Sequence, residues 1–362
     1  MMIRALSLTF LFALSHGAIL GKAFHVYSPS SKENTLWIVK ATTKGENLKL
    51  EVAEKVKFDF SGRVITTHPS KPLLYVTSTG GDPGKVPGAV VFLNEDGSYQ
   101  KHRKINFNDG ACYLSLDKGN RHLLGVSYGN GRLNVYPLDA NGIPGKAVTT
   151  IDEGKREAHC VLLPPDGKNV YVPYVKGNLA LLQYAYDDKT GKVTPLEPFD
   201  AKPPLGSGPR HMAYHPTLPM VYFSNEQGIG LSSYRRETNG QLKVEQDISI
   251  LPPGMSKIGL SASDLLITPD GQFLFAGLRG HRQDFSRISR YRVLEDGKAE
   301  FLGLTEADQV PWGLTLSPDG KFLLVSATTG ASLAAYRILK DGNLKRVATL
   351  AWDERMSDLV AR

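Results

Sequence analysis

A short apolar strand pattern recurs about every fifty residues along this chain of 362 residues, and no other feature restricts the possible fold as strongly. Successive copies begin between 46 and 53 residues apart. The repeated strand cores are Val26-Tyr27, Tyr75-Val76, Gly125-Val126, Tyr171-Val172, Tyr222-Phe223, Phe275-Ala276 and Leu324-Val325. A repeat of this length, built from strands and turns, is typical of β-propeller blades. Seven copies therefore predict an all-β, seven-bladed β-propeller.

Two kinds of turn flank the cores and define a blade of four antiparallel strands, A to D. A turn such as Pro269-Asp270-Gly271 joins strands A and B, because Pro presets the first turn dihedral and Gly accepts a positive φ. Five of the seven hairpins between strands C and D carry Asp-Gly or Asn-Gly, the pairs that suit a type I′ turn. The seven hairpins contain Lys44-Gly45, Asp96-Gly97, Asn141-Gly142, Thr190-Gly191, Asn239-Gly240, Asp296-Gly297 and Asp341-Gly342.

The two ends of the chain complement each other as parts of one blade. The segment from Phe24 to Ser28 is a strand B with no strand A before it, and the segment from Met356 to Arg362 resembles a strand A with no strand B after it. Pairing these segments closes the ring and removes the exposed edges of an open sheet. We therefore predict one propeller domain over residues 24–362, closed by N-terminal and C-terminal strands that share a blade.

Residues 1–23 have the pattern of a signal peptide. Arg4 precedes an apolar run from Ala5 to Leu20, and small residues stand at Gly21 and Ala23. The run is too short to span a membrane, so we expect cleavage near Ala23, a secreted or periplasmic protein and no membrane attachment after cleavage. The alternative is a buried first helix or strand.

Cys112 and Cys160 are the chain's two cysteines, and each stands at the start of a predicted channel-lining strand. In an oxidising compartment they either form a disulfide or remain buried free thiols. The sequence leaves both alternatives open.

The two faces of the predicted propeller differ in composition. The A–B turns and C–D hairpins share one face and have similar, purely structural sequences. The D–A and B–C connections share the other face, and they are irregular and carry titratable side chains. Examples are 157–160, 208–211, 225–226, 261–264 and 279–282. Because these segments belong to neighbouring blades, we expect them to converge at the mouth of the central channel and form a ligand site.

Motifs for metal, phosphate and nucleic acid binding are missing. The chain has no Cys-x-x-Cys, no His-Glu-x-x-His, no calcium loop and no phosphate-binding glycine motif. The formal net charge is +7, but the basic residues are scattered, so no nucleic-acid groove is expected. Arginine beside histidine and glutamate instead suits a small anionic or oxyanion-forming substrate. We expect neither a metal nor a cofactor.

The sequence resembles the seven-bladed propeller lactonases, a family that includes the bacterial propeller-type 6-phosphogluconolactonase and the fungal carboxymuconate cyclase. The resemblance covers essentially the whole chain after residue 23 and is most specific in Gly208-Pro209-Arg210-His211-Met212, His215-Pro216 and Asn225-Glu226. It implies a functional set of one His, two Arg and one Glu around the channel mouth. These positions are His159, Arg210, Arg279 and Glu226 in this chain.

The chemistry of these four residues suggests a role for each of them. His159 would activate water for attack on a lactone carbonyl. Arg210 and Arg279 would bind an acid group or stabilise the developing oxyanion, or else form a structural ion-pair ring. Glu226 would serve as a second base, as a general acid, or only as a partner that orients an arginine. A glutamate between two arginines should stay ionised and would then be a poor acid.

Further residues around this set are expected to contact the substrate. Asp264 stands where the family also tends to carry Asp. His281 and Arg282 either offer charge for an acidic substrate or form a solvated run of charged residues. His211 directly follows Arg210, so strand alternation should send it to the opposite side as a structural residue.

The expected function is metal-independent hydrolysis of a sugar-derived or carboxylated lactone by a monomer, whose partner is a small anionic lactone or its acid. The signal peptide would place the chain away from phosphorylated sugars, which leaves the particular lactone open. One alternative is a lactone-forming cycloisomerase of the carboxymuconate type. Another is a non-enzymatic secreted propeller that binds a protein or glycan through aromatic anchors on the site face.

Overall fold

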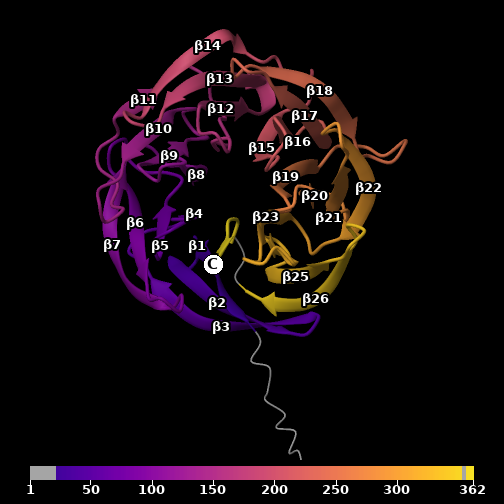
Figure 1. Cartoon of the computed structure of the whole chain (residues 1–362). Coiled ribbons are helices and arrows are strands. Elements are labelled where there is room, and N and C mark those ends of the chain that lie inside the picture. The colour runs from indigo at the N-terminus through magenta and orange to yellow at the C-terminus, as the bar shows by residue number, and fades with distance from the viewer. Residues whose placement is uncertain (1–21, 353–355) are drawn as a thin grey trace, which may run out of the picture.

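The computed structural model describes residues 22–352 and 356–362, which form a ring of seven antiparallel sheets around a central channel (Figure 1). Within these ranges six sheets have four strands and one sheet has three. The prediction of an all-β, seven-bladed propeller is confirmed. The predicted signal peptide lies outside the described residues, apart from Lys22 and Ala23, and stays a prediction.

The innermost strand of each sheet is β27, β4, β8, β15, β19 or β23, and in the three-stranded sheet it is β12. The sheet that closes the ring contains β27 (Val360–Ala361), β1 (Ala23–Ser30), β2 (Thr35–Lys44) and β3 (Asn47–Lys57). The next two sheets contain β4 (Val64–Thr67), β5 (Leu73–Thr77), β6 (Val86–Leu93) and β7 (Tyr99–Phe107), then β8 (Tyr113–Leu116), β9 (His122–Val126), β10 (Leu133–Pro137) and β11 (Thr149–Ile151). The three-stranded sheet contains β12 (Asn169–Tyr174), β13 (Ala180–Asp187) and β14 (Lys192–Asp200), with the short 3-10 helix η1 (Lys176–Asn178) between the first two.

The remaining sheets continue around the ring in the same order. They contain β15 (Pro209–Tyr214), β16 (Met220–Asn225), β17 (Gly230–Arg236) and β18 (Leu242–Ser249), then β19 (Leu260–Ile267), β20 (Phe273–Gly280), β21 (Arg287–Val293) and β22 (Ala299–Glu306). The last sheet contains β23 (Pro311–Leu316), β24 (Phe322–Ala327), β25 (Ser332–Ile338) and β26 (Leu344–Ala351). In the six four-stranded sheets each predicted core lies in the second strand from the channel, and the core Tyr171-Val172 lies in β12 of the three-stranded sheet.

The three-stranded sheet has a reduced version of a fourth strand. Two isolated antiparallel bridges, Ala158 with Tyr174 and Leu162 with Tyr171, hold the segment 158–162 against β12. This segment therefore occupies the position of an inner strand, and it brings His159 to the channel.

The two ends of the chain share a blade, as the sequence predicts. Val26 pairs with Ala361 and Tyr27 with Val360, so β27 becomes the inner strand beside β1. The backbone N–H groups of His25 and Arg362 donate to each other's carbonyls at 2.8 and 2.9 Å. The ring is thus closed by hydrogen bonds between the termini, and it has no open edge at the seam.

Neighbouring blades are joined by a repeated tyrosine contact that links the strand cores to the hairpins. Tyr27 donates its hydroxyl to the carbonyl of Gly97 at 2.6 Å, and Tyr222 donates to Gly297 at 2.8 Å. The φ angles of these two glycines are 85° and 84°, a conformation that disfavours side chains. The hairpin glycines therefore both form the turn and present a carbonyl to the adjacent blade.

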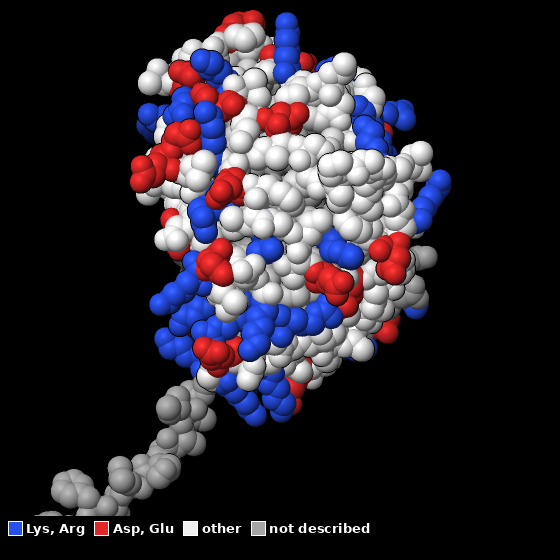
Figure 2. Space-filling view, turned by 90° about the vertical axis from the view of Figure 1, so that its right-hand side faces the viewer, with Lys and Arg blue, Asp and Glu red and all other residues white. Residues whose placement is uncertain are grey.

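Apolar side chains fill the space between blades, whereas the outermost strands face solvent. One cluster, for example, packs Val26 and Val39 of the closing sheet against Leu324 and Leu333 of the last sheet. Basic and acidic side chains are interspersed over the rim shown in Figure 2, which discourages pairing of the outer strands with other sheets.

In residues 22–352 and 356–362, no helix is long and apolar enough to cross a bilayer.

Candidate functional site

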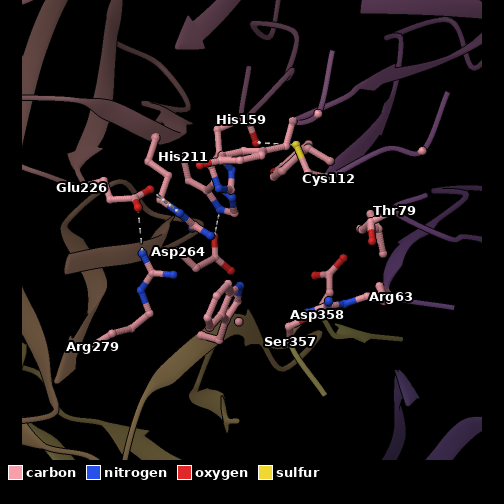
Figure 3. A pocket seen from close by; sticks show the side chains of 18 of the residues that line it. Arg63, Thr79, Cys112, His159, His211, Glu226, Asp264, Arg279, Ser357 and Asp358 are labelled. Carbon is pink, nitrogen blue, oxygen red and sulfur yellow. Dashed lines mark hydrogen bonds and ion pairs between the residues drawn. The ribbon is translucent and has the colours of Figure 1, made fainter. Parts of the chain in front are cut away.

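A cavity of about 520 Å³ opens at one end of the central channel, within the size range of small-molecule sites (Figure 3). It lies on the face of the D–A and B–C connections, where the sequence predicts the site. All seven blades contribute to its lining through Arg63, Val64, Thr79, Gly110, Cys112, Tyr113, Tyr128, Gly129, His159, Lys176, Arg210, His211, Glu226, Asp264, Arg279, His281, Trp312, Gly313, Ser357 and Asp358.

Two buried arginines share one carboxylate in this cavity. Arg210 in β15 places Nε 3.2 Å from Oε2 of Glu226, which directly follows β16. Arg279 in β20 places Nη2 3.5 Å from Oε1 of the same carboxylate. The exposed fractions of the two arginine side chains are only 1% and 4%. The antiparallel pairing of β15 with β16 brings Arg210 and Glu226 to the same end, as the sequence predicts.

The arginine cluster has more donors than acceptors. Nη2 of Arg279 donates to the carbonyl of Ala262 at 2.8 Å, and the guanidinium lies 4.4 Å from the ring centroid of Trp312. Nη1 of Arg210 and Nε of Arg279 are buried without a hydrogen bond, whereas Nε of Arg210 faces Oε2 of Glu226 at 3.2 Å. Burial and the charge of Arg210 lower the pKa of Arg279 to about 9. An anionic group in the cavity would supply the missing acceptors and the missing negative charge.

His159 is a neutral imidazole at the wall of the cavity. Its ring packs edge-on against Tyr128, with a centroid distance of 5.5 Å, and against His211 at 5.1 Å. Burial, followed by the charges of Arg210 and His211, holds the pKa of His159 well below its ordinary value. Of the two ring nitrogens of His159, Nδ1 is buried and has no hydrogen bond to a described residue. Nε2 is not buried in this way, so it is the nitrogen that is open to the cavity.

His211 lines the cavity together with Arg210, and the expectation that it would face the opposite side is wrong. Pro209 pairs with Asn225 and Met212 with Phe223, so β15 carries one extra residue at this point. Such a β-bulge breaks the alternation of side chains, and it turns Arg210 and His211 toward the same space. Nδ1 of His211 lies 2.7 Å from Oδ1 of Asp264 in β19, while Nε2 is buried without a partner.

Asp264 lies in the cavity wall, and its carboxylate is fully committed to protein groups. Besides His211, it accepts the backbone N–H groups of Leu265 and Leu314, each at 2.8 Å. Burial raises the pKa of Asp264, but His211, the N–H group of Leu314 and the charge of Arg210 together outweigh it, and the net shift is downward. The carboxylate is therefore the acceptor, and Nδ1 of His211 carries the hydrogen.

Asp358 lines the opposite side of the cavity and was not predicted as a site residue. Its carboxyl oxygens accept the N–H groups of Leu359 at 3.0 Å and Ile65 at 2.8 Å. Burial and the nearby Asp264 raise the pKa of Asp358 to about 8. The sequence offers a signal for this residue, because Ser-Asp-Leu occurs at both 263–265 and 357–359.

The structure separates the two remaining candidates for substrate contact. His281 lines the cavity, and its Nε2 lies 3.1 Å from the hydroxyl of Ser261. Arg282 does not line the cavity: its side chain is exposed, and its backbone passes close to Gly259 of the preceding connection. Lys176 and Trp312, which do line the cavity, were not singled out in the sequence.

Cys112 and Cys160 are free thiols, so the structure decides between the two alternatives for this pair. The Cys112 thiol donates to the carbonyl of Ala158 at 3.2 Å, which ties the blade of β8–β11 to the blade of β12–β14 at the channel. Burial raises the pKa of Cys112 to about 12 and also raises that of Cys160. Among the described residues, no group of three or more His, Cys, Asp or Glu side chains is arranged to hold a metal ion.

Comparisons with known proteins agree with the architecture. A family model described as "Lactonase, 7-bladed beta-propeller" matches residues 26–356. The 6-phosphogluconolactonase of Klebsiella pneumoniae subsp. pneumoniae is 27% identical over 319 residues, which cover 88% of this chain and 91% of the relative. The 6-phosphogluconolactonase of Pectobacterium carotovorum subsp. carotovorum is 28% identical over 334 residues, which cover 90% of this chain and 94% of that one.

Among solved structures, the periplasmic gluconolactonase PpgL of Pseudomonas aeruginosa superposes with a TM-score of 0.82. The superposition covers 94% of this chain and 99% of PpgL, at 19% sequence identity. This likeness concerns the fold alone.

Proposed function

The chain belongs to the family of seven-bladed β-propeller lactonases, and from this premise we propose that it hydrolyses a small anionic or polyhydroxylated lactone in the cavity of Figure 3. The Arg210–Glu226–Arg279 cluster is the observation that carries the proposal. Two buried guanidiniums share one carboxylate, and the positive charge and N–H donors left over form a preorganised site for an oxyanion.

The proposed reaction is attack of water on the lactone carbonyl. His159 accepts a proton from the water through Nε2, and the arginine donors stabilise the negative charge that develops on the carbonyl oxygen. Collapse of the tetrahedral intermediate breaks the bond between the carbonyl carbon and the ring oxygen. The ring oxygen takes the proton from the imidazolium, and the product is an open-chain hydroxy acid. Glu226 holds the two guanidiniums in position.

The substrate is proposed to be an aldonolactone, with or without a phosphate group. The sequence relatives are named 6-phosphogluconolactonase, and Lys176 at the rim of the cavity offers a further cation for an acidic substituent. The predicted signal peptide favours a secreted or periplasmic protein and an unphosphorylated lactone. We propose that the protein acts as a monomer.

Replacing Arg210 tests the proposal. We expect Arg210→Ala to lower kcat/KM by a factor of about 100 or more, equivalent to ~3 kcal/mol of transition-state stabilisation, as for loss of an oxyanion donor. Rates are measured by pH-stat with gluconolactone, 6-phosphogluconolactone and muconolactone after subtraction of spontaneous hydrolysis. Arg235→Ala is a matched control, because Arg235 pairs with Glu245 at 3.0 Å on the outer part of the same blade.

Two results would contradict the lactonase proposal. One is a wild-type protein that accelerates hydrolysis of no lactone in the panel, and the other is equal rates for Arg210→Ala and Arg235→Ala. Incubation with the open-chain acids shows whether the protein instead catalyses ring closure. The cavity presents converging Arg, His and Glu, and its partly buried aromatic side chains pack against these groups, which favours the lactonase over a protein-binding or glycan-binding propeller.

A further inference from the structure

Two buried ring nitrogens in the cavity wall have no hydrogen-bond partner, and they belong to adjacent histidines. They are Nδ1 of His159 and Nε2 of His211. Leaving such atoms unpaired in a protein interior costs free energy, so each needs a partner in the working enzyme. The other nitrogen of each ring has a different environment. Nε2 of His159 faces the cavity, and Nδ1 of His211 lies 2.7 Å from Oδ1 of Asp264.

The spacing of the two rings fits a direct bond between these nitrogens. An N–H···N bond of about 2.9 Å between two imidazoles puts the ring centroids about 5 Å apart. The centroids of His159 and His211 are 5.1 Å apart, with an interplanar angle of 62°. Figure 3 shows His159, His211 and Asp264 in succession along one wall of the cavity. The bond forms when the two nitrogens turn onto the line between the ring centroids.

The hydrogens of this row follow from its last member. Asp264 is an acceptor, so Nδ1 of His211 carries a hydrogen and Nε2 of the neutral ring is an acceptor. The partner that Nε2 requires is a donor, and Nδ1 of a neutral His159 can be that donor. The tautomer with hydrogen on Nδ1 leaves Nε2 of His159 unprotonated, which is the form that accepts a proton from water.

We propose that Asp264 and His211 form a hydrogen-bonded relay behind His159, which fixes its tautomer and orientation and stabilises its imidazolium during lactone hydrolysis. The inference rests on the proposed lactonase function. Asp264 and His211 are positioning residues, because they act through His159 and not on the substrate. When Nε2 of His159 takes a proton from water, the positive charge is shared with His211 and compensated by Asp264. The same proton then goes to the ring oxygen as the lactone carbon–oxygen bond breaks, and His159 returns to its neutral form.

The surroundings of His159 disfavour a positive charge on its ring, and the relay compensates for this. Arg210 and Arg279 both face the imidazole and oppose a positive charge on it, as does burial. Tyr128 and Tyr113, the aromatic neighbours of His159 and His211, offer only ring edges and faces. Among the described residues, Asp264 is the carboxylate that pairs with this histidine couple. Without the Asp264 carboxylate, His159 would be a weak base, because Arg210 and Arg279 oppose its protonation.

The relay is tested by tautomer measurement and by kinetics. In the wild-type protein, two-dimensional ¹H–¹⁵N NMR of ¹⁵N-histidine should show hydrogen on Nδ1 of both His159 and His211 near pH 8. Asp264→Asn should transfer the hydrogen of His211 to Nε2 and disturb the tautomer of His159. With the preferred lactone, it should lower kcat by about 100-fold to 10,000-fold and change KM by less than threefold, as for loss of a tautomer-fixing carboxylate.

Variants of His211 separate a relay from simple packing. His211→Gln keeps an amide N–H for Asp264 and an amide oxygen for His159, so we expect at least tenfold higher kcat than for His211→Leu. Asp117→Asn is the matched control, because Asp117 is a buried carboxylate that pairs with His122 at 2.9 Å and does not line the cavity. Thermal unfolding of each variant identifies any loss of folded protein.

Each part of the experiment has a result that would overturn the relay. Hydrogen on Nε2 of His159 in the wild-type protein would do so, as would equal kcat for His211→Gln and His211→Leu. Wild-type kcat in a folded Asp264→Asn protein would also contradict it while leaving the lactonase proposal intact. A wild-type protein inert toward every lactone would overturn both proposals.

Discussion

Asp264 and Asp358 face each other across the cavity in nearly the same backbone setting, yet their acidities differ in opposite directions. Each carboxyl accepts the N–H group of the following leucine and one N–H group from the inner strand of the next blade. The pKa of Asp264 is lowered, whereas that of Asp358 is raised to about 8. One side of the cavity therefore holds a carboxylate, and the other holds a protonated carboxyl at neutral pH.

The difference in pKa between the two aspartates arises from the blade that precedes each of them. Ahead of Asp264, the N–H group of His211 lies 3.3 Å from the Ser224 hydroxyl, and its imidazole reaches the carboxylate. Ahead of Asp358, Gly313 makes the same 3.3 Å contact with Ser326. A Cβ atom at Gly313 would lie 2.8 Å from the carbonyl oxygen of Ser357, so no side chain fits there.

Equivalent backbone positions in a repeat can thus carry opposite chemistry. The two N–H donors are part of the blade architecture, but the neighbouring side chain decides whether the carboxyl is charged. In this molecule the imidazole side also carries the two arginines, and so the charged groups gather on one wall.

The largest expected effect on stability is on the arginine side. Glu226→Gln removes the one carboxylate between two buried guanidiniums, and we expect a loss of about 3–5 kcal/mol in the free energy of unfolding. Urea unfolding at pH 7 measures it. Asp358→Asn should cost clearly less under the same conditions, because it removes a neutral carboxyl.

A second substitution shows whether the loss comes from uncompensated charge. Adding Arg210→Met to Glu226→Gln removes one of the two unpaired cations, and it should recover at least about 1 kcal/mol. If the double variant is less stable than Glu226→Gln alone, the cluster is held by packing rather than by charge balance.

The expected effect on the Asp358 side is smaller and depends on pH. Because the pKa of Asp358 is raised to about 8, the folded protein keeps a proton that the unfolded chain releases above about pH 4. The contribution of this residue to stability is complete at low pH, falls as the pH rises toward 8, and then levels off. The slope is at most about 1.4 kcal/mol per pH unit.

Asp358→Asn cannot ionise, so its stability relative to the wild type should rise from pH 5 to pH 8. Melting temperatures of the two proteins across this range measure the difference, and the contributions of other titrating groups cancel in the comparison. A constant difference between pH 5 and pH 8 would show that Asp358 is ionised in the folded protein throughout.

Most of the fold and the membership of the site could be predicted from regular features of the sequence. The spacing of the strand cores and the Asp-Gly hairpins predict the blades, and the strand order then brings Arg210, Glu226, Arg279 and His159 to one face. His211 could not be placed in this way, because a rule of strict strand alternation does not apply through the β-bulge in β15.

Two further features depend on contacts between blades. The partners of Asp264 and Asp358 include N–H groups of Leu314 and Ile65, about 50 and 290 residues away in the chain. Arg282 follows the cavity residue His281 directly, but a loop has no fixed alternation, and its side chain turns to solvent. Such differences arise from tertiary packing rather than from the repeat.

The pH dependence of kcat/KM tests the central claim most directly. This claim is that the Asp264 carboxylate raises the basicity of His159 and that Asp358, across the cavity, does not. Wild type, Asp264→Asn and Asp358→Asn are compared from pH 4 to pH 9 with the preferred lactone. We predict that Asp264→Asn lowers kcat/KM at least 100-fold and moves the acid limb of the profile to lower pH, whereas Asp358→Asn keeps this limb in place. Equal shifts of the acid limb in the two variants would contradict the account.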